Sequence, residues 1–149
     1  MLCRGEMMQV VSNLLMNSIY AMPVGGVLSI SVEEGVGSPD GIVLTIQDSG
    51  VGVAESDLPR LFEAFFTTRS TVGTGIGLFV AKQFVEGHGG RIEIASSRKG
   101  KDHGTTVRVF LPISTTYDSS GEGVRATDRM GNEMRKIVPL LPETLLLLY

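Results

Sequence analysis

The 149-residue sequence contains no tryptophan and only one cysteine, Cys3. A single thiol cannot form an internal disulfide, so a hydrophobic core and hydrogen bonds have to hold the fold together. This cysteine usage also favours a reducing compartment, and we expect a cytoplasmic protein. Because 42% of the residues are hydrophobic, the chain can form one hydrophobic core without disulfide bonds.

Long apolar runs and clusters of basic charge are also missing. The amino-terminal "MLCRGEMMQV" lacks the apolar segment of a signal peptide, and "TLLLLY" at the other end is far shorter than the roughly 20 residues of a membrane span. We therefore expect a soluble chain with no membrane span. The net charge is -3 and the basic residues are scattered, which argues against nucleic acid as a partner.

Hydrophobic periodicity predicts helices and strands that alternate in short units. Helices are expected at 7–22 and 76–87, with a short one capped by Ser56 or Asp57 and ending at Phe62, and strands at 27–33, 42–47, 90–97 and 105–112. After Pro112 the composition becomes polar and rich in Ser, Thr and Gly. This change predicts one domain over residues 1–113, followed by a flexible tail over 114–149.

Three amide side chains, Gln9, Asn13 and Asn17, recur at four-residue steps in the first helix, so they share one side of it. Asparagine is a poor helix former, which makes two of them in mid-helix unexpected. Two interpretations are equally open on spacing alone. The row is either a solvated stripe, or it supplies a neutral oxygen ligand of the kind that suits Mg²⁺.

The stretch "DSGVG", from Asp48 to Gly52, follows directly after an apolar strand. An ionised carboxylate accepts hydrogen bonds and cannot donate them, so a buried Asp48 would suit an amino group such as that of adenine. Gly50 and Gly52 would let the backbone approach a flat ring closely. By itself the stretch is equally compatible with an ordinary turn.

A second glycine-rich stretch, "GTGIGL", places Gly73, Gly75 and Gly77 just before a predicted helix. Backbone N–H groups that converge at the positive end of a helix bind phosphate. The spacing matches neither the P-loop nor the dinucleotide-binding motif. Upstream, Phe62, Phe65 and Phe66 of "LFEAFFTTRS" are expected either to pack in the core or to anchor a loop, from which Thr67, Thr68 and Arg69 reach over a polyphosphate.

The order of these motifs is more specific than any one of them. The series "NLLMN", "DSGVG", "LFEAFFTT", "GTGIGL" and "GTTVRVFLP" resembles the N, G1, F and G2 boxes and the final strand of the catalytic domain of sensor histidine kinases, over roughly Met7 to Pro112. That family belongs to the ATPase superfamily that includes DNA gyrase and a heat-shock chaperone. The resemblance implies the Bergerat fold, an α/β (α+β) two-layer sandwich with a mixed, mostly antiparallel sheet, helices on one face, and ATP-Mg²⁺ held beneath a lid.

The resemblance also implies roles for individual residues. Asn17 resembles the Mg²⁺ ligand, Asp48 the acceptor of the adenine amino group, and Thr105 the threonine that assists it. Arg69 stands where lysine is common and, with Asn13, is expected to act at the transferred phosphate. The remaining residues expected to contact ATP lie in the glycine-rich stretches and the lid: Gly50, Gly52, Phe62, Thr67, Thr68, Gly73, Thr74, Gly75, Ile76, Gly77 and Leu78.

Asn13 replaces the glutamate that activates water in the hydrolysing relatives, and an amide cannot act as that base. This favours the kinase branch, in which a histidine attacks the γ-phosphate. The acceptor is expected on a dimerisation domain outside this chain, with a response regulator as the next partner. The cytoplasmic location expected above is equally that of a domain belonging to a membrane-anchored sensor. We expect His88 to be structural and His103 to be simply exposed. The alternatives are a non-catalytic nucleotide-binding module and a serine kinase of the anti-sigma-factor type.

Overall fold

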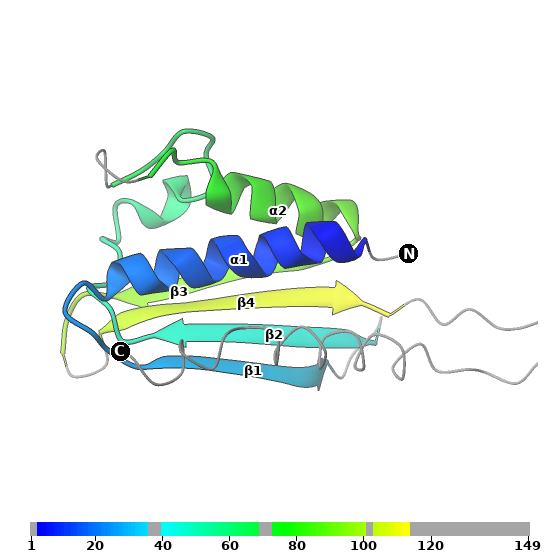
Figure 1. Cartoon of the computed structure of the whole chain (residues 1–149), viewed down its shortest axis with the longest axis horizontal. Coiled ribbons are helices and arrows are strands. Elements are labelled where there is room, and N and C mark those ends of the chain that lie inside the picture. Colours follow the sequence, from blue (N-terminus) through cyan, green and yellow to red (C-terminus); the bar gives the residue numbers. More distant parts are fainter. Residues whose placement is uncertain (1–2, 36–39, 69–72, 101–102, 114–149) are drawn as a thin grey trace, which may run out of the picture.

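The structure of the chain is a computed structural model, and it describes residues 3–35, 40–68, 73–100 and 103–113 (Figure 1). Arg69 and the expected tail over 114–149 lie outside these ranges. The elements are α1 (Arg4–Ala21), β1 (Leu28–Gly35), β2 (Gly41–Asp48), the 3₁₀ turn η1 (Leu58–Arg60), α2 (Gly77–Gly87), β3 (Arg91–Ser97) and β4 (Gly104–Pro112). In the part of the chain that the structure describes, no helix is long and apolar enough to cross a bilayer.

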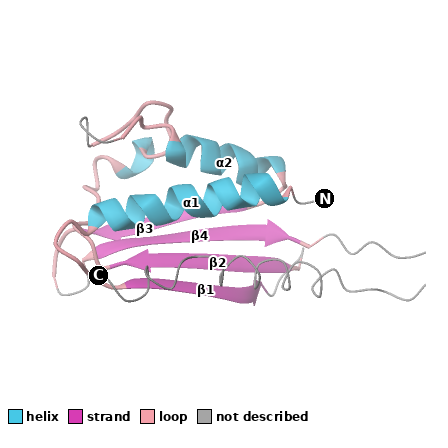
Figure 2. Ribbon diagram, viewed as in Figure 1, coloured by secondary structure: helices cyan, strands magenta, loops and turns pink. Residues whose placement is uncertain are grey.

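The four strands form one sheet in the order β1-β2-β4-β3. Every pairing among the described strands is antiparallel, with Ile46 opposite Val107 and Asp48 opposite Thr105. Both α-helices cover the same face of this sheet (Figures 1 and 2). The predicted two-layer α/β sandwich, with helices on one face, is therefore confirmed, although none of the pairings in the described part is parallel.

The hydrophobic core lies between α1, α2 and the inner face of the two central strands. Alternation along β2 turns Ile42, Leu44 and Ile46 toward the helices, and all three are at most 4% exposed. Leu14 and Val10 of α1 pack against this face and are each 1% exposed. Burial of each such side chain contributes about 1.5–3 kcal/mol to stability.

The same alternation continues to the ends of the central strands, where the inward side chains become polar. Asp48 follows Ile46 on the inner face of β2, and Thr105 precedes Val107 on the inner face of β4. Since Asp48 pairs directly with Thr105, two polar groups meet at one end of the apolar core. The strand period alone thus delivers a carboxylate to the helix-covered side of the sheet.

The first helix begins three residues before its predicted start, at Arg4 in place of Met7. Cys3 occupies the N-cap position without a side-chain hydrogen bond. Because helix starts are read from Ser, Thr, Asp or Asn caps, the sequence carried no signal for this one. The other short helix is a single 3₁₀ turn that follows Asp57 and ends before Phe62.

Candidate functional site

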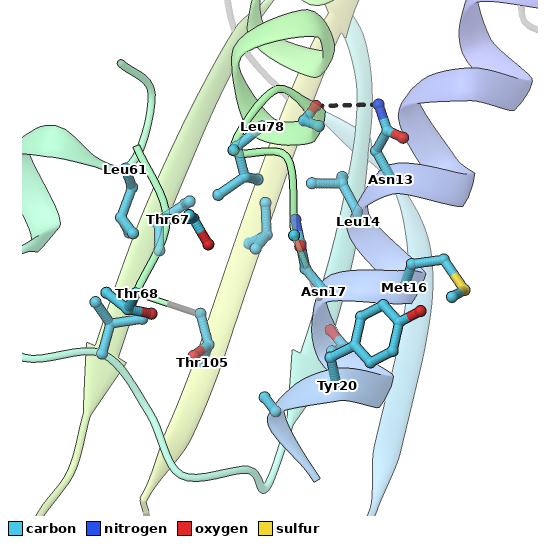
Figure 3. Close-up of a pocket in the computed structure, with 18 of the residues that line it drawn as sticks. Asn13, Leu14, Met16, Asn17, Tyr20, Leu61, Thr67, Thr68, Leu78 and Thr105 are labelled. Atoms are coloured by element: carbon cyan, nitrogen blue, oxygen red, sulfur yellow. Dashed lines mark hydrogen bonds between the residues drawn. The ribbon is translucent and has the colours of Figure 1, made fainter. Parts of the chain in front are cut away.

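A cavity of about 300 Å³ lies between α1, the C-terminal end of β2, the N-terminal end of β4 and the segments before α2. Figure 3 shows Asn13, Asn17 and Tyr20 on the α1 side, with Thr67 and Thr68 across from them. The cavity is lined by Asn13, Leu14, Met16, Asn17, Ser18, Tyr20, Ala21, Asp48, Gly52, Val53, Leu61, Phe66, Thr67, Thr68, Gly73, Thr74, Gly75, Gly77, Leu78, Ile94, Thr105 and Val107. Most of the site residues expected from the sequence are among them.

Asp48 lines this cavity and is 4% exposed. Its Oδ1 atom accepts hydrogen bonds from the backbone N–H groups of Gly50, at 2.9 Å, and Thr105, at 3.2 Å. Two donors on one oxygen fix the carboxylate plane and offset part of the cost of burying a charge. Oδ2 is the oxygen left to accept from a ligand amino group.

A small hydroxyl network supports Asp48 from β3 and β4. Ser96 Oγ donates to the Gly104 carbonyl at 2.7 Å and accepts from Val53 N–H at 2.8 Å. The Ser96 hydroxyl proton is thereby used, so Thr105 Oγ1, 2.9 Å away, donates to Ser96 Oγ. Thr105 then offers only acceptor lone pairs to the cavity. Ser96 was missed from the sequence, although it is the polar residue on the otherwise apolar inner side of β3.

The amide row on α1 is present as expected, with Gln9 Nε2 donating to Asn13 Oδ1 at 2.9 Å. Asn13 Nδ2 in turn donates to the Gly77 carbonyl at 3.0 Å, drawn as the dashed line in Figure 3. This bond joins α1 to the first residue of α2. Asn17 makes no such link, is exposed, and lines the cavity. Both asparagines therefore border the cavity, while Gln9 does not.

The start of α2 and the glycines before it form the far wall. Gly73, Thr74, Gly75, Gly77 and Leu78 all line the cavity. Helix N-termini carry free N–H groups and a partial positive charge, which suits an anion.

Gly75 has a φ of +68°, and a Cβ there would lie 2.5 Å from the Phe65 carbonyl carbon. Its carbonyl accepts a hydrogen bond from Phe65 N–H at 3.0 Å. No other residue fits this turn without a backbone shift.

Three of the described residues expected at the site do not line the cavity. Gly50 contacts the end of α1, where a Cβ would lie 2.6 Å from the Ala21 carbonyl oxygen. Ile76 is the N-cap of α2. Phe62 is half-buried beneath Lys82, whose Nζ lies 5.3 Å from the ring centroid. Arg69 is outside the described residues.

The expectation that Phe65 packs in the core or anchors the loop is wrong. Its ring is 75% exposed, and its φ of 66° is positive, which is unusual for a residue other than glycine. The backbone bond from Phe65 N–H to Gly75 holds this turn, and it directs the side chain outward. Phe66 instead lines the cavity, with the Arg60 guanidinium 4.4 Å from its ring centroid.

Several apolar lining residues were not identified from the sequence. Met16 and Tyr20 come from the exposed side of α1, and both are large side chains that remain more than 40% exposed. Their spacing from the two asparagines was a usable signal, because Met16 is three residues from Asn13 and Tyr20 is three from Asn17, and residues three or four apart share a helix face. Leu61, Ile94 and Val107 are further apolar lining residues, and nothing in their local pattern separates them from core residues.

The two histidines have different environments. His88 Nε2 lies 2.6 Å from Glu6 Oε2, which connects the end of α2 to the first turn of α1 and supports the structural role expected for it. His103 was expected to be simply exposed. Although its side chain keeps contact with solvent, its Nδ1 lies 2.7 Å from the Gly50 carbonyl oxygen.

We predict that Gly52→Ala strongly destabilises the fold beside the cavity. Gly52 has a φ of +65°, and a Cβ would lie 2.1 Å from the Ser97 carbonyl oxygen. We expect a loss of about 2–3 kcal/mol in the free energy of unfolding, because strain and collision act together.

Gly100→Ala is the matched control, since Gly100 also has a positive φ, of +81°, but meets nothing within 4 Å. Urea denaturation of both variants measures the difference. Equal losses would show that the contact with Ser97 is unimportant.

The charges of the site limit its chemistry. Asp48 is the only carboxylate among the described lining residues, and these residues include no Lys, Arg or His. No three His, Cys, Asp or Glu side chains gather to hold a metal anywhere in the described ranges. A cation here would therefore depend on a neutral oxygen such as that of Asn17 and on oxygens of the ligand itself. This donor set fits Mg²⁺, which retains most of its waters.

Residues 4–115 match the family model described as "Histidine kinase-, DNA gyrase B-, and HSP90-like ATPase". The sensor histidine kinase ZraS of Escherichia coli K12 is 41% identical over 108 residues, covering 72% of this chain and 22% of ZraS. The chain thus spans about a fifth of the length of this relative.

Solved structures show the same fold. A mycobacterial sensor histidine kinase, MprB, superposes with a TM-score of 0.62 at 30% identity, over 70% of each chain. The nucleotide-free catalytic domain of histidine kinase ThkA gives 0.61 at 26% identity, over 72% of this chain and 66% of the other. Since the family model spans most of the chain and the same fold recurs in these structures, this chain belongs to the family of histidine kinase-, DNA gyrase B-, and HSP90-like ATPases.

Proposed function

We propose that this domain binds ATP with Mg²⁺ in the cavity, and that it is the catalytic domain of a two-component sensor histidine kinase. The observation that carries the proposal is Asp48, a buried carboxylate with Oδ1 fixed by two backbone donors and Oδ2 left for a ligand. A carboxylate that accepts from an exocyclic amino group selects adenine over guanine, which has a carbonyl oxygen at the corresponding position. Thr105 supplies a second acceptor beside it.

With adenine at Asp48, the triphosphate extends toward Asn17, Asn13 and the first residues of α2. The cavity joins these groups, and Asn13 is bonded to Gly77 at the start of that helix. The N–H groups and dipole of α2 would hold phosphate oxygens. Asn17 would hold Mg²⁺, which neutralises charge on the phosphates when it is bound. Thr67, Thr68 and Thr74 also line the cavity.

The reaction is the transfer of the γ-phosphate to a histidine on a dimerisation domain, followed by transfer to a response regulator. Neither described histidine suits the acceptor role, because His88 is paired with Glu6 and His103 with Gly50. The acceptor must then come from a separate domain. The relatives named above are sensor histidine kinases, which favours this function over a non-catalytic module or a serine kinase.

Transfer in trans tests this proposal. The chain is incubated with γ-labelled ATP, Mg²⁺ and a dimerisation domain from a related sensor kinase. We expect label on that domain that is stable in base and labile in acid, as phosphohistidine is. Label on a serine of an added protein would support the serine-kinase alternative. ATP binding without any transfer, across several dimerisation domains, would support the non-catalytic module.

We predict that Asn17→Ala weakens the Mg²⁺-dependent part of ATP binding. Asn17 offers the cavity a neutral oxygen, and removing one ligand should lower the apparent affinity for the metal by at least about tenfold. ATP titrations with Mg²⁺ and with EDTA measure this, and the EDTA value should change little.

Ser12→Ala is the matched control, because Ser12 is exposed on α1 and does not line the cavity. An Asn17→Ala variant with the Mg²⁺ dependence of the wild type would remove Asn17 as the ligand.

A further inference from the structure

We propose that His103 is a positioning residue for nucleotide binding, and that it acts through an Nδ1–H group that holds the loop carrying Gly50. The proposal rests on the ATP site described above. The Gly50 carbonyl oxygen lies 2.7 Å from His103 Nδ1. A carbonyl oxygen can only accept a hydrogen bond, so the proton of this bond is on Nδ1. Both the neutral Nδ1–H tautomer and the imidazolium provide it.

Gly50 transmits this contact to Asp48 because its peptide groups are held on both sides. Its carbonyl accepts from His103, and its N–H donates to Asp48 Oδ1 at 2.9 Å. The bond from Gly50 is one of only two described hydrogen bonds to that carboxylate. A rotation of Gly50 that broke the first contact would therefore weaken the second, and the carboxylate plane would become less defined.

The end of α1 closes the loop from the other side. Val51 N–H donates to the Ala21 carbonyl at 3.0 Å, and Gly50 lies so near Ala21 that a Cβ would not fit. The loop is thus clamped between α1 and His103. Since the α1 side is backbone packing, His103 is the only side chain in the described structure that holds the Gly50 carbonyl.

Gly104 explains why His103 can reach this position. Its φ is +139°, and a Cβ would lie within 1.9 Å of the Asp48 carbonyl oxygen. β4 therefore begins directly against the end of β2, and the residue before it is brought over the loop. His103 also borders a second hollow of about 240 Å³, which shares Asp48 and Thr105 with the main cavity.

Three substitutions test which ring nitrogen matters. The amide nitrogen of His103→Asn falls near the place of Nδ1, whereas that of His103→Gln falls near the place of Nε2. We expect His103→Ala and His103→Gln to weaken ATP binding about three- to tenfold, and His103→Asn to stay within about twofold of the wild type. Isothermal titration with Mg²⁺-ATP measures the affinities.

The phosphate end of the cavity is untouched by these changes, so transfer at saturating ATP should remain at the wild-type rate while KM rises. A merely structural defect would lower the rate and the thermal midpoint together. Wild-type affinity in His103→Ala would overturn the proposal. An equal loss in the Asn and Gln variants would also overturn it.

Histidine NMR supplies a readout that needs no nucleotide. The ¹⁵N chemical shifts of the free protein, recorded at a pH at which the imidazole is neutral, should show the Nδ1–H tautomer for His103. The Nε2–H tautomer would contradict the proposal, whatever the binding data show. If the tautomer is as expected but the wild type binds no ATP, the contact stands and the proposed function fails.

Discussion

Asp48→Asn is expected to lower ATP affinity by about ten- to a hundredfold, the range expected when a charge-assisted hydrogen bond is lost. The backbone N–H groups of Gly50 and Thr105 both point at one side-chain oxygen of residue 48. An asparagine has only one oxygen, so these two donors would keep it. The amide nitrogen would then occupy the place of Oδ2, where it presents a donor to the amino group of adenine.

Titrations with ATP and GTP test this assignment. The wild type should prefer ATP clearly, and Asp48→Asn should lose most of that preference, because an amide donor can meet the guanine carbonyl. Thermal unfolding without nucleotide shows whether the variant is folded, since Asp48 is buried. Equal affinities of the wild type for the two nucleotides would refute the adenine assignment.

The isolated domain is expected to release phosphate from ATP hardly faster than the uncatalysed reaction. Asn13 stands where a base is needed, and its amide is committed to Gln9 and Gly77. Asp48 is the only carboxylate among the described lining residues, and it is held by the backbone N–H groups of Gly50 and Thr105 at the end of β2. Without a group to deprotonate water, the site positions ATP for an external nucleophile.

Asn13→Glu should raise phosphate release by tenfold to a hundredfold, on the order expected for a partly aligned general base. Asn13→Gln is the matched control, because it has the same length and cannot act as a base. An ionised glutamate cannot donate to the Gly77 carbonyl, so Asn13→Ala, which also lacks the 3.0 Å bond, is the control for any shift of α2. Rapid release by the wild type that survives Asn13→Ala would exclude the kinase branch.

Much of the fold was predictable from local patterns. Alternation in "GIVLTIQD" and "TTVRVFLP" gave the two central strands, and the glycines around α2 gave its limits to within one residue. The start of α1 was not predictable, because Cys3 provides no side-chain cap. The outward turn of Phe65 was also missed, since it depends on a bond to Gly75, ten residues away in the chain.

By itself the sequence determined the inner and outer faces of the sheet, the row of amides on α1 and the position of the glycines, because these follow from periods of 2 and 3.6 residues and from the space that a Cβ needs. Only the tertiary structure decided which groups meet. The pairing of β2 with β4 brings Thr105 to Asp48, 57 residues apart, and the packing of α1 on α2 brings Asn13 to Gly77. The contact of His103 with Gly50 is of the same kind. Such contacts join distant segments, and no local pattern in the chain specifies them.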